Sequence, residues 1–305
     1  MNLENTDKAT VLFNMHIMWY ESEMVCETFD SIVKSLEFSK SKVSFKFCLN
    51  SQTYLEKPIN GKSEDMFSTF LSHAIFSKYN VEIVYKTDKD PFFNVGDWRR
   101  EEYNNDYKYI VWGESDTLLP TDYFRILDHI NITEPHVLTM SSRKMWDDSW
   151  FGVEHELFRN MRGDSKTMGI LGSGQYISVN QVNLFNSLLP EINIVKLNRT
   201  KIDGSLLALS PNLPTPFISP KQHFFGEDTC ASGVFTLNGI PQYNVATRIK
   251  GHNYNHPRKR VNTDSNRNSD AFMQYSSESR SAMMDFLKNI LKEKNEKNKS
   301  NNTES

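Results

Sequence analysis

The chain has 305 residues, of which 38% are hydrophobic, 24% charged and 12% aromatic, a composition typical of a folded globular protein. Its 35 basic and 38 acidic residues give a net charge of −3, which excludes a broadly basic nucleic-acid coat but permits a local basic patch. We expect no membrane segment, since no stretch has the ~18 uncharged apolar residues that a membrane helix needs. The polar residues 1–8 predict no signal peptide, and three scattered cysteines favour a reducing, cytoplasmic location.

Strand-like and helix-like apolar patterns alternate in the first half of the chain. Short apolar runs predict strands at residues 10–17, 43–50, 81–85 and 107–112. Apolar residues spaced three to four apart predict helices at 21–38 and 64–79. This alternation predicts an α/β fold, with a Rossmann-like, mostly parallel sheet flanked by helices on both faces.

The second half is less regular. It contains a predicted short helix at 123–129, a strand at 135–140, a helix at 181–188 and a proline-rich connector. A further helix is predicted at 277–292, and the Lys/Asn/Glu-rich end from 293 to 305 is predicted to be disordered. We therefore expect one body, residues 1–265, followed by a C-terminal helix and disordered tail at 266–305.

Two carboxylates follow the strand predicted at 107–112. Glu114 and Asp116 stand two residues apart, so on an extended chain both side chains point the same way. In open α/β sheets ligands bind at the carboxyl ends of the strands. Two carboxylates there could bind one divalent cation and so neutralise a diphosphate, although an acidic, solvated turn is an equally good interpretation.

A second acidic pair, Glu227 and Asp228, follows two aromatic residues and a glycine. A partly desolvated carboxylate has a raised pKa, as a general base for a hydroxyl requires. Acidic residues are also common in the first turn of a helix. Both interpretations hold together if the pair opens a short helix that faces a pocket.

The segment from Arg248 to Arg260 carries five basic residues, two histidines (His252 and His256) and no acid. It could bind a diphosphate, supply an imidazole to a metal or contact a polyanionic acceptor. A solvated basic loop remains the plain alternative.

The order of these motifs resembles the GT-A glycosyltransferases, especially the inverting family 2 type, over roughly residues 9–260. That family has a Tyr-Asn-Glu-like turn after its first strand, and Tyr20-Glu21 is similar. Its second strand usually ends in an aspartate near the nucleotide base, a place that Asn50 takes here. The resemblance implies that these residues contact a nucleotide-sugar donor.

Two further donor contacts are implied by the same resemblance. Gly96 with Arg99 and Arg100 is similar to the glycine and Arg-Asn pair that precede the family's metal motif, and the arginines are candidates for holding phosphates. Gly174 would let the backbone approach the donor sugar. The body then divides into a nucleotide-sugar-binding half at 8–118 and an acceptor and catalytic half at 119–265.

The metal and catalytic motifs complete the resemblance. Glu114-Ser115-Asp116 is similar to the family's Asp-x-Asp motif, in which the second carboxylate is the principal metal ligand. Some members add a late histidine, which His252 or His256 resembles. Glu227-Asp228 is similar to the family's catalytic Glu-Asp pair, with Asp228 as the expected base.

The resemblance implies a Mn²⁺- or Mg²⁺-dependent inverting glycosyltransferase that moves a hexosyl or pentosyl group from a nucleotide diphosphate to a hydroxyl. A saccharide or glycan is the first choice of acceptor. The alternatives are a hydroxymethylated base in DNA, because of the basic run, and a non-catalytic nucleotide- or carbohydrate-binding module. Such a module would not need both acidic motifs. A nucleotidyltransferase would need a glycine- and lysine-rich loop near the first strand, which is missing from residues 16–23.

Overall fold

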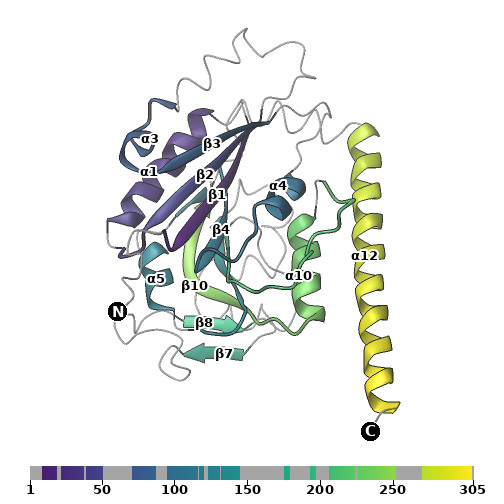
Figure 1. The fold of residues 1–305 in the computed structure, drawn as a ribbon. Coiled ribbons are helices and arrows are strands. Elements are labelled where there is room, and N and C mark those ends of the chain that lie inside the picture. Colours follow the sequence, from purple (N-terminus) through teal and green to yellow (C-terminus); the bar gives the residue numbers. More distant parts are fainter. Residues whose placement is uncertain are drawn as a thin grey trace, which may run out of the picture.

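The computed structural model describes residues 9–18, 22–37, 39–50, 71–86, 95–115, 117–119, 123–130, 132–144, 175–178, 193–196, 206–223, 226–251 and 270–303. One mixed sheet lies between two layers of helices (Figure 1). The predicted α/β class, with helices on both faces and a helix at the C-terminal end, is confirmed.

The first half of the chain forms four parallel strands in the order β3-β2-β1-β4. These are β1 (Val11–Met18), β2 (Val43–Asn50), β3 (Val81–Lys86) and β4 (Tyr109–Glu114). Each ends at the same edge of the sheet because all four run in one direction. This carboxyl edge therefore gathers the residues that follow β1, β2 and β4.

The second half extends the sheet beyond β4. Strand β9 (Leu206–Leu209) is antiparallel and lies between β4 and β6 (Val137–Lys144). Strand β10 (Gln242–Gly251) runs parallel to β6. The short strands β8 (Asn193–Lys196) and β7 (Gln175–Ser178) follow as an antiparallel pair, and β5 (Thr117–Leu118) pairs with the end of β10. Since β1, β2, β3, β4, β6 and β10 share one direction, the predicted mostly parallel sheet is confirmed.

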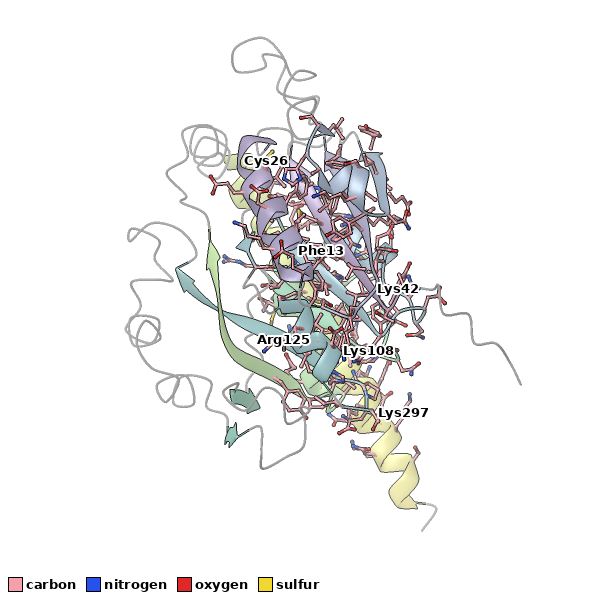
Figure 2. All side chains as sticks on the ribbon, turned by 90° about the vertical axis from the view of Figure 1, so that its left-hand side faces the viewer. Phe13, Cys26, Lys42, Lys108, Arg125 and Lys297 are labelled. Atoms are coloured by element: carbon pink, nitrogen blue, oxygen red, sulfur yellow. The ribbon has the colours of Figure 1, made fainter. Side chains whose placement is uncertain are left out.

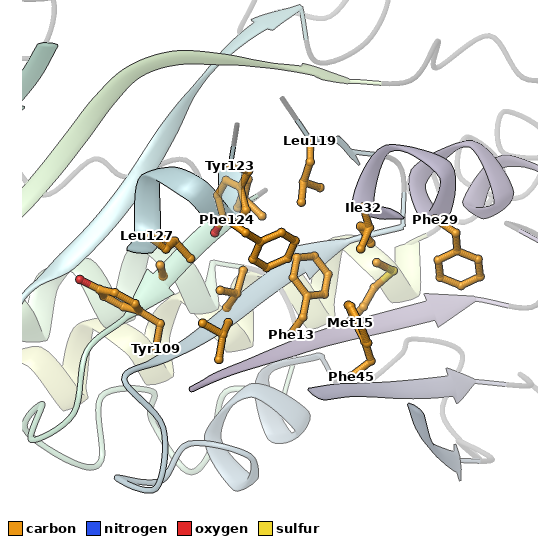
Figure 3. Close-up of a cluster of buried hydrophobic side chains, with 14 of the residues drawn as sticks. Phe13, Met15, Phe29, Ile32, Phe45, Tyr109, Leu119, Tyr123, Phe124 and Leu127 are labelled. Carbon is orange, nitrogen blue, oxygen red and sulfur yellow. The ribbon is translucent and has the colours of Figure 1, made fainter. Parts of the chain in front are cut away.

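Alternation along β1 explains the two helical layers. Val11, Phe13, Met15 and Ile17 are fully buried on one face, while Leu12 belongs to a separate core on the other. The first face is covered by α1 (Ser22–Leu36), α3 (Ile75–Lys78) and α5 (Tyr123–His129). Figure 3 shows Phe13 facing Phe124 of α5, with ring centroids 6.1 Å apart.

The opposite face is covered by α4 (Val95–Glu101), α10 (Glu227–Leu237) and α12 (Asp270–Thr303). Here Trp112 of β4 packs with Phe217, their ring centroids 5.6 Å apart, and with residues of α10. Helix α12 lies along the outside of α10 (Figure 1). Its Leu287 packs against Gly233 of α10.

Helix α12 is longer than predicted at both ends. It begins at Asp270 rather than 277, and it continues to Thr303 through residues that were predicted to be disordered. Figure 2 labels Lys297 on this exposed end of the helix. Residues 291–300 are all exposed, and Lys294 among them donates a hydrogen bond to the carbonyl of Leu237 in α10. The Lys- and Glu-rich sequence propagates a helix that is already nucleated by the packed turns before it.

Other element predictions were partly correct or cannot be compared. The strand predicted at 135–140 is β6, shifted to Val137–Lys144, and β9 was not predicted because its four residues are too short to stand out beside the prolines. Of the helix predicted at 64–79, α3 is the described helical part; residues 51–70, and the helix predicted at 181–188, lie outside the described residues. Within the described ranges, no helix combines the length and the apolar character needed to cross a bilayer.

Candidate functional site at the carboxyl edge of the sheet

Glu114 is the last residue of β4 and stands at the carboxyl edge of the sheet. The next residue, Ser115, is buried, and its carbonyl accepts a hydrogen bond of 2.7 Å from Thr28 Oγ1 of α1. This bond fixes the chain where the strand ends. In the register between β1 and β4, His16 lies directly beside Glu114.

His16 is a polar site neighbour that the sequence analysis did not single out. It belongs to the even-numbered residues of β1, with Leu12 and Asn14, whereas the odd-numbered residues enter the larger apolar core. A polar residue near the carboxyl end of a strand, alternating with buried apolar residues, was the available signal.

Arg99 of α4 connects the two acidic motifs. Its side chain is 4% exposed, and its Nη2 donates to Glu114 Oε1 at 2.8 Å while its Nη1 donates to Glu227 Oε1 at 2.6 Å. Its guanidinium carbon lies 5.0 Å from the centre of the Trp112 ring. One buried cation thus joins the end of β4 to the start of α10.

The charges around Arg99 shift the pKa values of the group. Burial raises the pKa of Glu227, and neighbouring Asp228 adds to this, whereas Arg99 opposes it. Burial is the largest single effect on Arg99 and lowers its pKa, but the carboxylates of Glu227, Glu114 and Asp228 together raise the pKa above its usual value. Among the described residues, Arg99 therefore interacts with three carboxylates, those of Glu227, Glu114 and Asp228.

Glu227 and Asp228 open helix α10, as predicted for this pair. Gly226 precedes them with φ at 77°, a left-handed conformation that glycine adopts without the penalty of a Cβ atom. Glu227 is buried against Arg99, while Asp228 is half-buried and its Oδ1 accepts a bond of 2.7 Å from the backbone N–H of Thr229. The two adjacent carboxylates therefore have different surroundings, one enclosed and one accessible.

Arg100, the second predicted phosphate ligand, points away from Glu114. It donates to the carboxylate of Asp97 on its own helix and to the carbonyl of Ser219 at 2.9 Å. Both arginines are thus engaged with groups of the protein itself, and a phosphate-binding role for either stays a prediction.

The basic run begins inside the sheet rather than in a loop. Arg248 to Gly251 form the end of β10, where Lys250 pairs with Leu118 and Gly251 pairs with Thr117 of β5. Thr117 follows Asp116 in the chain, and Gly251 precedes His252. The pairing therefore connects the basic segment to the acidic motif after β4.

Several predicted site residues lie outside the described residues: Tyr20, Glu21, Asp116, Gly174, His252 and His256. Asn50 is described by its backbone, which pairs with Met18 at the end of β1. Across the described ranges, no group of three or more His, Cys, Asp or Glu side chains has an arrangement that could hold a metal ion.

Comparisons with known proteins match the chain to solved structures of low identity, among them the following four. No protein-family model matches the sequence, and no curated protein matches it. S. aureus TarS, residues 1–349, is 10% identical with a TM-score of 0.48, the match covering 91% of this chain and 72% of that one. The same TarS fragment in complex with UDP-GlcNAc gives 11% identity and a TM-score of 0.42, with 91% and 73% covered.

The galactosyltransferase LgtC, in complex with donor and acceptor sugar analogues, is 11% identical with a TM-score of 0.33, covering 65% of this chain and 57% of that one. The 4-diphosphocytidyl-2C-methyl-D-erythritol synthase of Anaerococcus prevotii is 7% identical with a TM-score of 0.35, covering 84% and 98%.

Proposed function

We propose that this chain is a glycosyltransferase that transfers a sugar from a nucleotide-diphosphate donor to a hydroxyl acceptor. The observation that carries the proposal is the meeting of three motifs, far apart in sequence, at one edge of the sheet. Arg99 joins the acidic end of β4 to the acidic start of α10. The pairing of β5 with β10 brings the backbone of Lys250 and Gly251, within the basic segment, beside Leu118 and Thr117, which follow the acidic motif.

A divalent cation, Mn²⁺ or Mg²⁺, fits the charges at this edge. Arg99 already neutralises part of the charge of Glu114, so Asp116 is the better ligand of the two. Thr117 and Gly251 form a pair in the sheet, and their chain neighbours are Asp116 and His252, which supports these two as ligands, with His256 as the alternative to His252. When bound, the cation would stabilise the negative charge that develops on the leaving diphosphate.

Asp228 is proposed as the general base. Its half-buried carboxylate is accessible, whereas Glu227 is enclosed with Arg99 and so serves to position the start of α10. Asp228 would take the proton of the acceptor hydroxyl as that oxygen attacks the anomeric carbon. Attack from the side opposite the leaving diphosphate inverts the configuration of that carbon.

A saccharide or glycan remains the first choice of acceptor. Modified DNA is the second, and one observation favours it: Arg248 and Lys250 lie in β10, which ends beside the acidic motif, so basic residues are available near the reacting edge.

The activity is tested by measuring the nucleotide released from a panel of UDP-, GDP- and ADP-sugars, with Mn²⁺ present or chelated. We expect one sugar nucleotide to be hydrolysed, or its sugar to be transferred, only when Mn²⁺ is present. Asp228→Asn should keep donor binding and lose at least about 100-fold in turnover, as expected for loss of a general base. Asp116→Ala should lose metal-dependent donor binding.

The matched control is Asp285→Asn, which removes an exposed carboxylate on α12 far along the chain from both motifs. It should behave as wild type. If no donor binds or reacts in a metal-dependent way, the enzyme proposal is wrong. Incubation with plain and hydroxymethylated duplex DNA then decides the acceptor, because a mass increase of one sugar on the modified duplex alone would establish DNA.

A further inference from the structure

We propose that His223 is a binding residue of this site, whose imidazole Nε2 contacts a phosphate oxygen of the donor diphosphate. This inference rests on the proposed function and adds a residue that the sequence motifs did not include. It is carried by an oriented, exposed imidazole that stands next to the cross-link between the two acidic motifs.

The orientation of His223 is fixed by Asp97 of α4. Nδ1 of His223 lies 2.8 Å from Oδ2 of Asp97. A carboxylate only accepts hydrogen bonds, so Nδ1 carries the proton and donates it. The ring is then held with Nε2 at its opposite end, and the side chain is 47% exposed.

The backbone of His223 is fixed as well. The N–H of Gly96 donates to the carbonyl of His223 at 2.7 Å. A Cβ atom at Gly96 would come within 2.8 Å of the same oxygen, so α4 and this segment are in close contact. Arg100 links Asp97 to the carbonyl of Ser219, which holds the other end of the segment. An imidazole supported in this way has little freedom to lose when it binds a ligand.

The position of His223 relates it to the rest of the site. Asp97–His223 and Arg99–Glu227 are successive links between the same two segments, α4 and the chain that leads into α10. The inner link is buried, with the Arg99 side chain 4% exposed, and the outer link opens to solvent through His223. His223 therefore lies on the solvent side of the contact that holds Glu227, in the chain segment that leads to Asp228.

Charge favours an anionic group as the ligand of Nε2. Arg99 is shared between Glu114 and Glu227, so its guanidinium is already engaged by carboxylates of the protein itself. When both ring nitrogens carry a proton, Nδ1 donates to the Asp97 carboxylate and Nε2 would donate to a phosphate oxygen. Such charge-assisted hydrogen bonds are the stronger kind.

The experiment is isothermal titration of wild type and His223→Gln with UDP, GDP and inorganic pyrophosphate, each with Mn²⁺ and with EDTA. We expect His223→Gln to raise the Kd of the diphosphate that wild type binds by about 5- to 20-fold, the scale of one charge-assisted hydrogen bond at a partly exposed site. Thermal unfolding should show that the variant remains folded.

Lys221→Gln is the matched control. Lys221 is exposed on the same segment, carries one positive charge, and its only hydrogen bond to the described residues is from its backbone. It should leave the Kd within about twofold of wild type, because an exposed charge contributes little to affinity.

The outcomes separate the two proposals. If wild type binds a nucleoside diphosphate and His223→Gln binds it equally well, the role of His223 is wrong and the proposed function stands. An equal loss of diphosphate affinity in Lys221→Gln would also overturn the role of His223, because the effect would then come from the overall positive charge of the segment. If pyrophosphate alone binds and depends on His223, the anion contact holds and the proposed function fails. If none of the three probes binds, both are wrong.

Discussion

Arg99 and Glu227 are 128 residues apart in sequence and share a buried hydrogen bond of 2.6 Å, while the same guanidinium holds Glu114 at 2.8 Å. This arrangement makes Arg99 the central residue of the site, although it need not touch a substrate. It explains how α4, the end of β4 and the start of α10 keep one relative position.

Replacement of Arg99 by Met should be strongly destabilising. The change would leave the buried Glu227 carboxylate without its cation, and loss of one partner of a buried ion pair costs about 3–5 kcal/mol. Urea unfolding of wild type and Arg99→Met measures the difference. The double variant Arg99→Met/Glu227→Gln should recover part of the loss, because the uncompensated charge is removed. Equal stability of wild type and Arg99→Met would contradict the central role of this residue.

His136 should make the protein less stable in mild acid. Its Nδ1–H donates to the carbonyl of Glu134 and its Nε2 accepts from the Tyr109 hydroxyl at 2.9 Å, so the ring is held neutral. Burial lowers the pKa of His136 below its usual value of 6.5.

Between the lowered pKa and about 6.5, the unfolded chain binds the proton and the folded chain does not, so stability falls as the pH decreases through that window. Urea unfolding between pH 5 and 8 should show this dependence of the free energy of unfolding on pH in wild type, and a weaker dependence in His136→Gln. Parallel curves for the two proteins would rule out this residue as the cause.

Gly96→Ala should lower the stability of the protein more than Gly233→Ala does, although both glycines lie in helices that cover one face of the sheet. A Cβ at Gly96 would lie 2.6 Å from the backbone oxygen of Gln222, which cannot move alone, so we expect a loss of about 1–3 kcal/mol.

A Cβ at Gly233 would meet the end of the Leu287 side chain at 2.9 Å, which can change rotamer. The helix propensity of alanine offsets part of that cost, by up to about 1 kcal/mol. Thermal or urea unfolding of both variants compares them. A Gly96→Ala protein as stable as Gly233→Ala would show that α4 and the segment before α10 are not in rigid contact.

Leu287→Ala and Leu291→Ala test how α12 is attached. Leu287 is partly buried and packs against α10 and the apolar core on that face, whereas Leu291 is 45% exposed. We expect Leu287→Ala to cost about 2 kcal/mol, near the lower limit for a buried leucine because this one is partly buried. Leu291→Ala should stay within about 0.5 kcal/mol of wild type. Similar losses of stability at both positions would mean that α12 is rotated about its own axis, so that Leu291 also packs against the rest of the protein.

The sequence by itself determined the α/β class of the protein. Apolar runs at β1, β2, β3 and β4, separated by amphipathic stretches, indicate which faces are buried, and burial pattern is a local property of each segment. It also located the acids after β4 and the helix that starts at Glu227, because strand ends and first helical turns have local signals.

Tertiary structure alone decided how those parts meet. The insertion of β9 between β4 and β6, the pairing of Thr117 with Gly251, and the two partners of Arg99 all join residues that lie far apart in the chain. An arginine in a sequence carries no sign of which carboxylate it will bind, since a charge interacts with whatever the fold brings within a few ångströms. The role of Arg99, and the orientation of His223 by Asp97, are therefore properties of the folded sheet and its helices.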